Sequence, residues 1–162
     1  MTYYVLDNII SKTQIFKLYN ILISTPSWTL DRESLNENDL EAIGFPGVIV
    51  EEEGNSRNTY LSGYFHSMLD TVKLKFVEKY KFDLPNNVHR IHLGAKNSKS
   101  ETAFHQDTTE SSWWTILGFL TPVWKLEDGG ELKIEGETID CKPGRFIIFK
   151  SKLFICFSLS LF

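Results

Sequence analysis

Apolar positions recur at helical spacing in two segments of the first half of the chain. The first begins at Ser11-Lys12-Thr13-Gln14, which has the form of a capping box, and ends before Pro26. The second, residues 60–80, keeps a spacing of three or four between apolar positions over about five turns, and Pro85 follows it. The pattern therefore predicts two helices, each with one buried face.

The second half of the chain changes to short runs of β-branched and aromatic residues, separated by clusters of Gly, Pro, Asp and Ser. Such runs predict strands joined by turns. The predicted strands are 88–93, 102–106, 113–121, 131–135, 137–141 and 145–150, with turns at 94–100, 128–130 and 142–144. The polar segment 27–58 is predicted to be a loop region with one strand near 48–50. Helices followed by antiparallel strands predict an α+β domain in which helices back a sheet or barrel.

Length and composition favour one folded domain. At 162 residues, with 42% hydrophobic and 23% charged residues, the chain is long enough for a single core and is not disordered throughout. The net charge of −4 and the acidic run at 51–53 argue against nucleic acid as a partner.

The cysteines and the two ends of the chain point to a cytoplasmic location. Cys141 and Cys156 are too few for a disulfide framework or a zinc pattern, and we expect both to be buried small apolar residues. The first residues lack the features of a secretory signal. The apolar end, 153–162, is too short to span a bilayer as a helix, so no membrane partner is expected.

His105 and Asp107 are the residues best suited to hold a metal ion. They are separated by one residue, so on a strand both side chains project from the same face and can converge on one ion. An H-x-D pair alone is a weak signal, and by itself it would favour an ordinary structural role. Its setting strengthens it, because a glycine turn at 129–130 and a Pro-Gly turn at 143–144 lead into further strands.

The segment 88–151 resembles the double-stranded β-helix core of Fe(II)- and 2-oxoglutarate-dependent oxygenases, in the prolyl 4-hydroxylase-like branch. Within it His105 and Asp107 match the H-x-D iron ligands, 117–124 resembles the central strand that ends in Trp, and 128–132 resembles the glycine turn. The resemblance implies one domain over 1–162 with a jelly-roll or cupin-like barrel. Its parts would be mainly helical support at 1–84, the β-helix core at 85–151 and an atypical apolar tail at 152–162.

The resemblance also implies a reaction. Such enzymes bind Fe(II) through two histidines and one carboxylate, which leaves three adjacent positions for 2-oxoglutarate and O2. 2-Oxoglutarate is decarboxylated to succinate and CO2 while a C–H bond of the substrate is hydroxylated, and ascorbate serves as reductant. The resemblance implies a prolyl residue of a protein or peptide as the leading substrate, with a small molecule as the other class.

Two features depart from the pattern that the resemblance implies. The third ligand is expected in a stretch like F-x-S-x-L-x-H, where this chain has Ile155 at the histidine position and no later histidine. The cation that would pair with 2-oxoglutarate is also missing, since no basic residue follows Lys152. We expect that the tail replaces an authentic C-terminus through truncation or a frame change, and that 155–162 can pair as one strand.

These departures leave two alternatives to an active oxygenase. One is a barrel that has kept its fold without its chemistry, as an inactive protein or a binding module. The other is an altered, cupin-type metal site completed by a further carboxylate or by His92.

The remaining histidines and the tryptophans have weaker assignments. His92 lies where the resemblance implies a cosubstrate-binding tyrosine, so it is a candidate for contact with 2-oxoglutarate, against the alternative of a strand histidine at the surface. His89 is expected at the edge of the core and His66 on the flank of the long helix. Trp113 and Trp114 are expected to fill the barrel, with a substrate entrance as the alternative.

Overall fold

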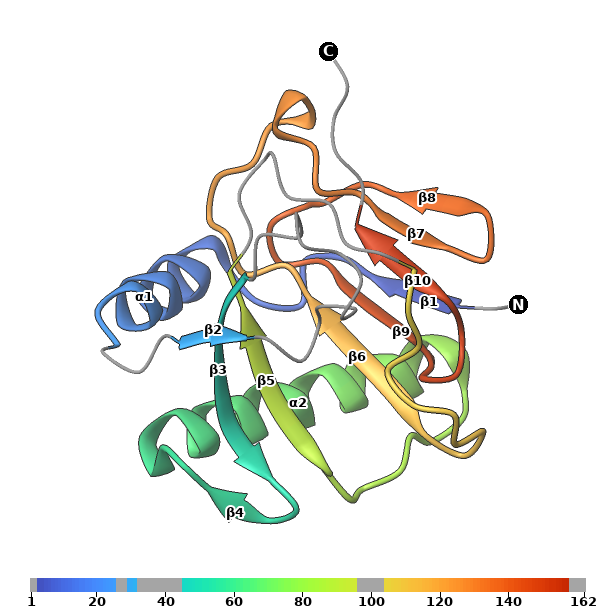
Figure 1. The fold of residues 1–162 in the computed structure, drawn as a ribbon, viewed down its shortest axis with the longest axis horizontal. Coiled ribbons are helices and arrows are strands. Elements are labelled where there is room, and N and C mark those ends of the chain that lie inside the picture. Colours follow the sequence, from blue (N-terminus) through green and yellow to red (C-terminus); the bar gives the residue numbers. More distant parts are fainter. Residues whose placement is uncertain (1–2, 26–28, 32–44, 96–103, 158–162) are drawn as a thin grey trace. The chain divides into compact units, whose positions relative to one another are not determined.

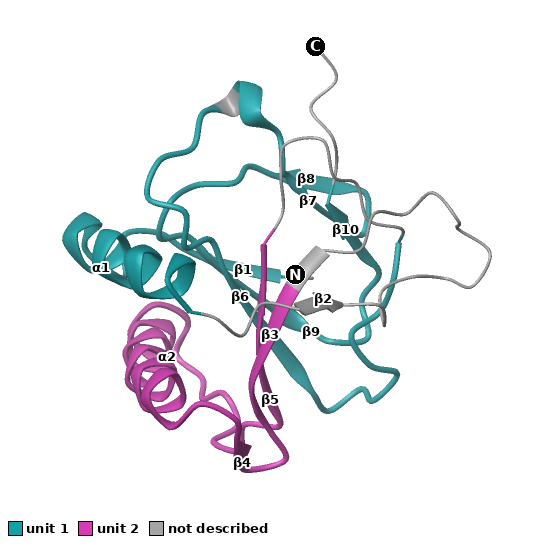
Figure 2. Ribbon diagram, turned by 60° about the vertical axis from the view of Figure 1, so that its left-hand side comes forward, with its two compact units in different colours: residues 1–25, 96–162 teal, residues 26–95 magenta. Residues whose placement is uncertain are grey.

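The computed structural model describes residues 3–25, 29–31, 45–95 and 104–157 (Figure 1). The chain divides into two compact units (Figure 2). The first unit comprises residues 1–25 and 96–162, and the second comprises residues 26–95. Among the described residues, no helix is long and apolar enough to cross a membrane.

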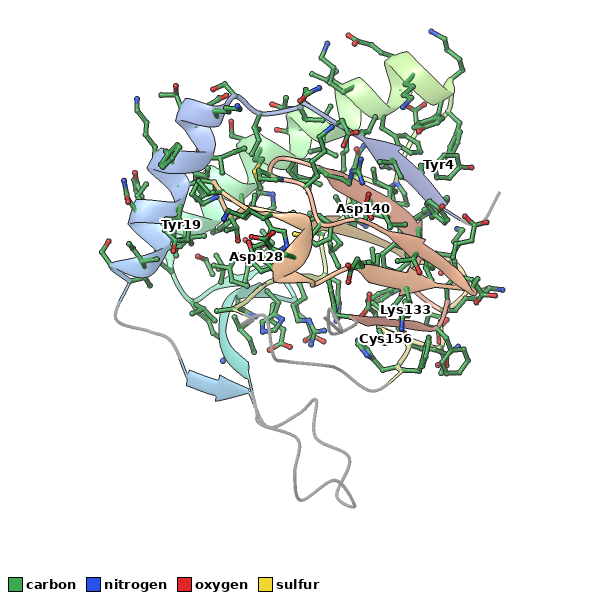
Figure 3. All side chains as sticks on the ribbon, turned by 90° about the horizontal axis from the view of Figure 1, so that it is seen from above. Tyr4, Tyr19, Asp128, Lys133, Asp140 and Cys156 are labelled. Carbon is green, nitrogen blue, oxygen red and sulfur yellow. The ribbon has the colours of Figure 1, made fainter. Side chains whose placement is uncertain are left out.

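The first unit is built on two antiparallel sheets of three strands each. One sheet has the order β1-β9-β6, formed by Tyr3–Leu6, Phe146–Lys150 and Trp114–Gly118. The other has the order β10-β7-β8, formed by Ile155–Phe157, Leu132–Ile134 and Glu137–Ile139. The short 3-10 helix η1, Leu126–Asp128, precedes the glycine turn into β7. Lys133 and Cys156 lie directly opposite each other in this second sheet (Figure 3).

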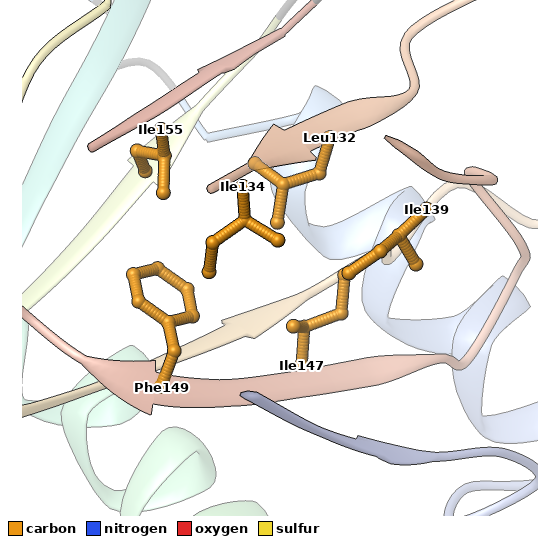
Figure 4. Close-up of a cluster of buried hydrophobic side chains, with 6 residues drawn as sticks. All are labelled: Leu132, Ile134, Ile139, Ile147, Phe149 and Ile155. Atoms are coloured by element: carbon orange, nitrogen blue, oxygen red, sulfur yellow. The ribbon is translucent and has the colours of Figure 1, made fainter. Parts of the chain in front are cut away.

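A buried apolar cluster joins the two sheets of the first unit (Figure 4). It takes residues from β9 on one side and from β7, β8 and β10 on the other. Its members are Leu132, Ile134, Ile139, Ile147, Phe149 and Ile155. The alternation of strand side chains explains this arrangement, because Leu132 and Ile134 share one face of β7 and Ile147 and Phe149 share one face of β9.

Helix α1, Lys12–Ile23, also belongs to the first unit and confirms the first predicted helix. Ser11 caps it: its side chain accepts from the backbone of Gln14, whose side chain accepts in return from the backbone of Ser11. Gly144, with a φ of +74°, makes the turn before β9 close to α1, where an added Cβ would lie 3.0 Å from Ile15 Cδ1. Glycine is required there by both the backbone and the close approach.

The second unit combines one long helix with a sheet around β3. Strand β3, Phe45–Glu52, pairs with β2 (Thr29–Asp31), β4 (Asn55–Ser56) and β5 (Arg90–Gly94). Helix α2, Thr59–Tyr80, confirms the second predicted helix to within one residue at its start. It ends because Lys81 adopts the left-handed conformation, with a φ of +65°, before the predicted stop at Pro85 is reached.

The structure corrects several predicted elements. Strands β2 and β4 lie in the segment predicted to be mostly loop, and β1 was not predicted, because its partner β9 is distant in sequence (Tyr3 pairs with Phe149). The strand predicted at 102–106 is reduced to an isolated bridge at His105, and residues 102–103 lie outside the described residues. Most of the predicted turn at 94–100 and residues 158–162 also lie outside the described residues. The predicted tail strand is present over its first three residues as β10.

Candidate metal-binding site

The site is built where the segment carrying His105 pairs with the start of β10. The backbone N–H of His105 donates to the carbonyl of Ile155 at 3.0 Å, and the N–H of Ile155 donates to the carbonyl of His105 at 2.9 Å. Residues that exchange both bonds are direct partners, with Cα atoms about 5.5 Å apart and side chains on the same face. The residue at the expected position of the third ligand therefore lies directly beside His105.

His105 and Asp107 lie close together, although the segment that carries them forms only an isolated bridge and not the strand from which the prediction was made. The distance from His105 Nε2 to Asp107 Oδ1 is 3.7 Å. The His105 side chain is 44% exposed and that of Asp107 is 27% exposed, so both are reachable from solvent. Between them, Gln106 donates from Nε2 to the carbonyl of Lys152 at 2.5 Å, which ties this segment to the turn after β9.

Asp107 is held by two neighbouring hydroxyl residues. Its Oδ2 accepts a hydrogen bond from Thr115 Oγ1 at 2.5 Å, and Thr115 Oγ1 lies 2.9 Å from Ser151 Oγ. The backbone carbonyl of Ser151 accepts from the N–H of Asp107 at 3.1 Å and from that of Thr108 at 3.3 Å. Both the backbone and the side chain of Asp107 are thus fixed, by Ser151, which directly follows β9, and by Thr115 of β6.

These two side chains suit a divalent metal ion that prefers nitrogen and oxygen ligands. Two such ligands on adjacent positions of one ion lie about 3 Å apart, given bonds of roughly 2.1 Å. The observed 3.7 Å separation is close to this value, so a small side-chain rotation would bring both atoms to one ion.

The third side chain of a two-histidine, one-carboxylate set is not supplied at the expected position. Ile155 is only 2% exposed and belongs to the apolar cluster, so it borders the site without a ligating atom. Within the part of the chain that the structure describes, no group of three or more His, Cys, Asp or Glu is arranged to hold a metal ion.

The other histidines lie in the second unit. His92 is on β5 with an exposed side chain on the face opposite to Leu93, as its alternation with Ile91 and Leu93 predicts. His89 is exposed, so its predicted place at the core edge is wrong; it precedes β5, and its carbonyl accepts from the N–H of Glu53 at 2.7 Å.

His66 is more than a surface residue of the long helix. Its Nε2 lies 2.9 Å from Glu51 Oε2, which also accepts a short hydrogen bond from Ser62. These hydrogen bonds, first that of Ser62 and then that of His66, lower the pKa of the Glu51 carboxyl despite its burial. Glu51 therefore belongs to a buried polar contact between β3 and α2, although it opens the acidic run seen in the sequence.

The tryptophans of 113–114 and the two cysteines differ in their exposure to solvent. Trp113 is 38% exposed, while the ring of Trp114 is half-buried and has Lys150 Nζ 4.1 Å from its centroid. Cys156 is buried, as predicted. Cys141 is half-buried, and burial raises the pKa of its thiol to about 12, which makes it unreactive as a nucleophile.

Sequence reasoning missed Thr115 and Ser151 as site residues. Thr115 is a hydroxyl residue in the otherwise apolar run Trp114-Thr115-Ile116-Leu117, and it faces inward because its direct partner on β9 is Phe149, a member of the cluster. A polar residue among apolar residues of a predicted strand is the sequence feature that could have indicated Thr115 as a site residue. Ser151 is almost fully buried, but nothing in its sequence pattern shows that it lies beside Thr115.

Comparison with solved structures shows a likeness of fold. A Pseudomonas putida prolyl-4-hydroxylase matches with a TM-score of 0.62 at 12% identity, covering 96% of this chain and 84% of its own. A Trichoplax adhaerens prolyl hydroxylase in complex with a hypoxia-inducible-factor peptide fragment matches with a TM-score of 0.62 at 16% identity, covering 98% and 77%. The fold resembles that of the prolyl hydroxylases.

A viral collagen prolyl hydroxylase from Paramecium bursaria Chlorella virus-1, solved as a 2-oxoglutarate complex, extends the likeness. It matches with a TM-score of 0.57 at 14% identity, covering 98% of this chain and 88% of its own. No family model matches the chain, and no curated protein sequence does. The likeness to prolyl hydroxylases is therefore one of fold, and it agrees with the predicted mixture of helices and antiparallel strands.

Proposed function

We propose that this chain is an Fe(II)- and 2-oxoglutarate-dependent oxygenase that hydroxylates a C–H bond, with a prolyl residue of a protein or peptide as substrate. The observation that carries the proposal is the convergence of His105 and Asp107, 3.7 Å apart, on a fold that resembles prolyl hydroxylases. The neighbours bound to a peptide and to 2-oxoglutarate support the substrate class and the cosubstrate.

The residues of the site have distinct tasks in this proposal. His105 would ligate iron through Nε2 as a neutral imidazole, and Asp107 through Oδ1. The bound iron and 2-oxoglutarate supply the oxidation chemistry, while the protein orients them. Ile155 and the apolar cluster to which it belongs would limit the access of water to one side of a bound ion. His92 remains the candidate for contact with 2-oxoglutarate.

A second candidate function follows from Ile155. With an isoleucine where a third ligand is expected, the barrel would hold metal through two protein ligands and could act as a binding module without turnover. This alternative shares the fold and the H-x-D pair with the first, so only activity separates them.

Succinate formation distinguishes the two functions. Purified protein is incubated with Fe(II), ascorbate, O2 and 2-oxoglutarate, with and without prolyl peptides, beside His105→Ala and the control His89→Ala. Succinate that is lost in His105→Ala and kept in His89→Ala supports the oxygenase. Absence of succinate from folded, metal-loaded protein contradicts it and favours the binding module. A raised KM for 2-oxoglutarate in His92→Ala would support the assignment of His92.

A further inference from the structure

The hydroxyl of Thr115 donates a hydrogen bond to one of the two carboxylate oxygens of Asp107. Thr115 lies on β6 directly opposite Phe149, so its side chain points to the same face as the apolar cluster. From there Oγ1 reaches Asp107 Oδ2 at 2.5 Å, a distance typical of a hydroxyl bound to an ionised carboxylate. The other oxygen, Oδ1, is the one that lies 3.7 Å from His105 Nε2.

The direction of this hydrogen bond follows from counting hydrogens. A threonine hydroxyl has one hydrogen, and an ionised carboxylate can only accept. Thr115 therefore donates to Asp107, and the contact of 2.9 Å between the two hydroxyls requires Ser151 to donate to Thr115. The result is a directed chain from Ser151 through Thr115 to Asp107.

Ser151 is well placed to begin this chain. Its side chain is buried, its N–H donates to the carbonyl of Trp113 at 3.1 Å, and its carbonyl accepts from the N–H groups of Asp107 and Thr108. The residue before β6 and the segment that carries Asp107 are thus both hydrogen-bonded to Ser151, which directly follows β9.

We infer that Thr115, oriented by Ser151, is a positioning residue that makes Asp107 present only Oδ1 to a metal ion. This inference rests on the proposed function. It deepens that function because a carboxylate held by one oxygen occupies one coordination position instead of two, which leaves more positions for cosubstrate and O2. Because Ile155 beside His105 has no ligating atom, no third side chain at that position would help to hold the ion, and the orientation of Asp107 matters more.

Cobalt(II) titration tests the inference, since the visible absorption of cobalt reports both affinity and coordination. Thr115→Val removes the hydroxyl and keeps the shape, and we expect it to weaken cobalt binding by about 10-fold or more, within the range seen when partners of metal ligands are removed. It should also change the absorption spectrum. Thr115→Ser restores the donor and should restore both affinity and spectrum. Thr138→Val, the same change at an exposed position of β8, should leave both unchanged.

The chain of hydroxyls predicts non-additivity. Ser151→Ala should weaken cobalt binding in the wild-type background and have no further effect in the Thr115→Val background, because its effect passes through Thr115. Circular dichroism confirms that each variant is folded, and Thr115→Ala replaces Thr115→Val if valine disturbs the fold.

The outcomes separate this inference from the proposed function. Equal affinity and an unchanged spectrum in Thr115→Val would overturn the positioning role while leaving the metal site intact. Independent, additive effects of Ser151→Ala and Thr115→Val would overturn the directed chain. Cobalt binding that is absent from the wild type, or unaffected by His105→Ala, would overturn the metal site itself.

Discussion

Replacing Ile155 by histidine is expected to convert the proposed two-ligand metal site into a three-ligand site. Ile155 and His105 are direct partners in an antiparallel bridge, so a histidine there would project from the same face, close to the imidazole of His105. The change adds a nitrogen ligand without moving the backbone.

The size of the effect follows from the energy of metal ligation. Structural zinc sites with four ligands contribute about 10–16 kcal/mol, or roughly 3 kcal/mol for each ligand, which corresponds to about a 100-fold lower Kd. In the absence of metal the same change should destabilise the protein by about 2–4 kcal/mol, because it replaces a fully buried apolar side chain of the cluster by a polar one.

Metal titration and thermal unfolding with and without cobalt measure the two effects. Without metal, Ile155→His should have a lower Tm than wild type. Added cobalt should raise the Tm of Ile155→His by more than it raises the Tm of wild type. Ile139→His is the matched control: Ile139 is 5% exposed in the same cluster, but β8 is separated from β10 by β7. It should lose stability without gaining affinity. Folded Ile155→His protein that binds cobalt no more tightly than wild type would refute the placement of Ile155 at the metal.

Three further predictions concern stability. Glu51→Ala should lower the free energy of unfolding, measured with denaturant, by about 2–4 kcal/mol, because two donors of α2 lose their buried acceptor. Glu52→Ala, which removes an exposed ion pair, should lower it by under about 1 kcal/mol. Hydrogen bonds from Arg145 lower the pKa of Asp7, so Asp7 stabilises the fold above its unfolded pKa of about 3.9 and loses this contribution as the pH falls through the lower folded value. Asp7→Asn should therefore be less stable than wild type at pH 7, and a gap that stays constant down to pH 2 would contradict this. Ile134→Ala should cost about 2–5 kcal/mol because Ile134 is fully buried, and a loss below 1 kcal/mol would show that the cluster is poorly packed.

The periodic elements could be predicted because their signals are local. The capping box at Ser11 and the long apolar stripe of α2 depend on residues a few positions apart, and both helices were confirmed. Strand β1 could not be predicted in the same way, because it is stabilised by pairing with β9 at the other end of the chain.

The candidate site likewise combines a feature that the local sequence predicts with contacts that it does not. The H-x-D spacing is local, and the structure has His105 and Asp107 close together, 3.7 Å apart, while their role as metal ligands stays a prediction. The hydrogen bonds of Thr115 and Ser151 to each other and to Asp107 join three separate segments of the sequence, so no local pattern predicts them. Glu51 is a similar case, because the acidic run in the sequence does not indicate that this residue is buried against hydrogen-bond partners on α2.

Anomalous diffraction from crystals grown without oxygen, with Fe(II) and 2-oxoglutarate, would show directly whether His105 and Asp107 bind iron. We expect one iron peak bonded to Nε2 of His105 and to a single oxygen, Oδ1, of Asp107. We also expect this peak to be lost in His105→Ala. Well-ordered crystals with no iron at these two residues, or with iron bound only elsewhere, would show that His105 and Asp107 are not iron ligands.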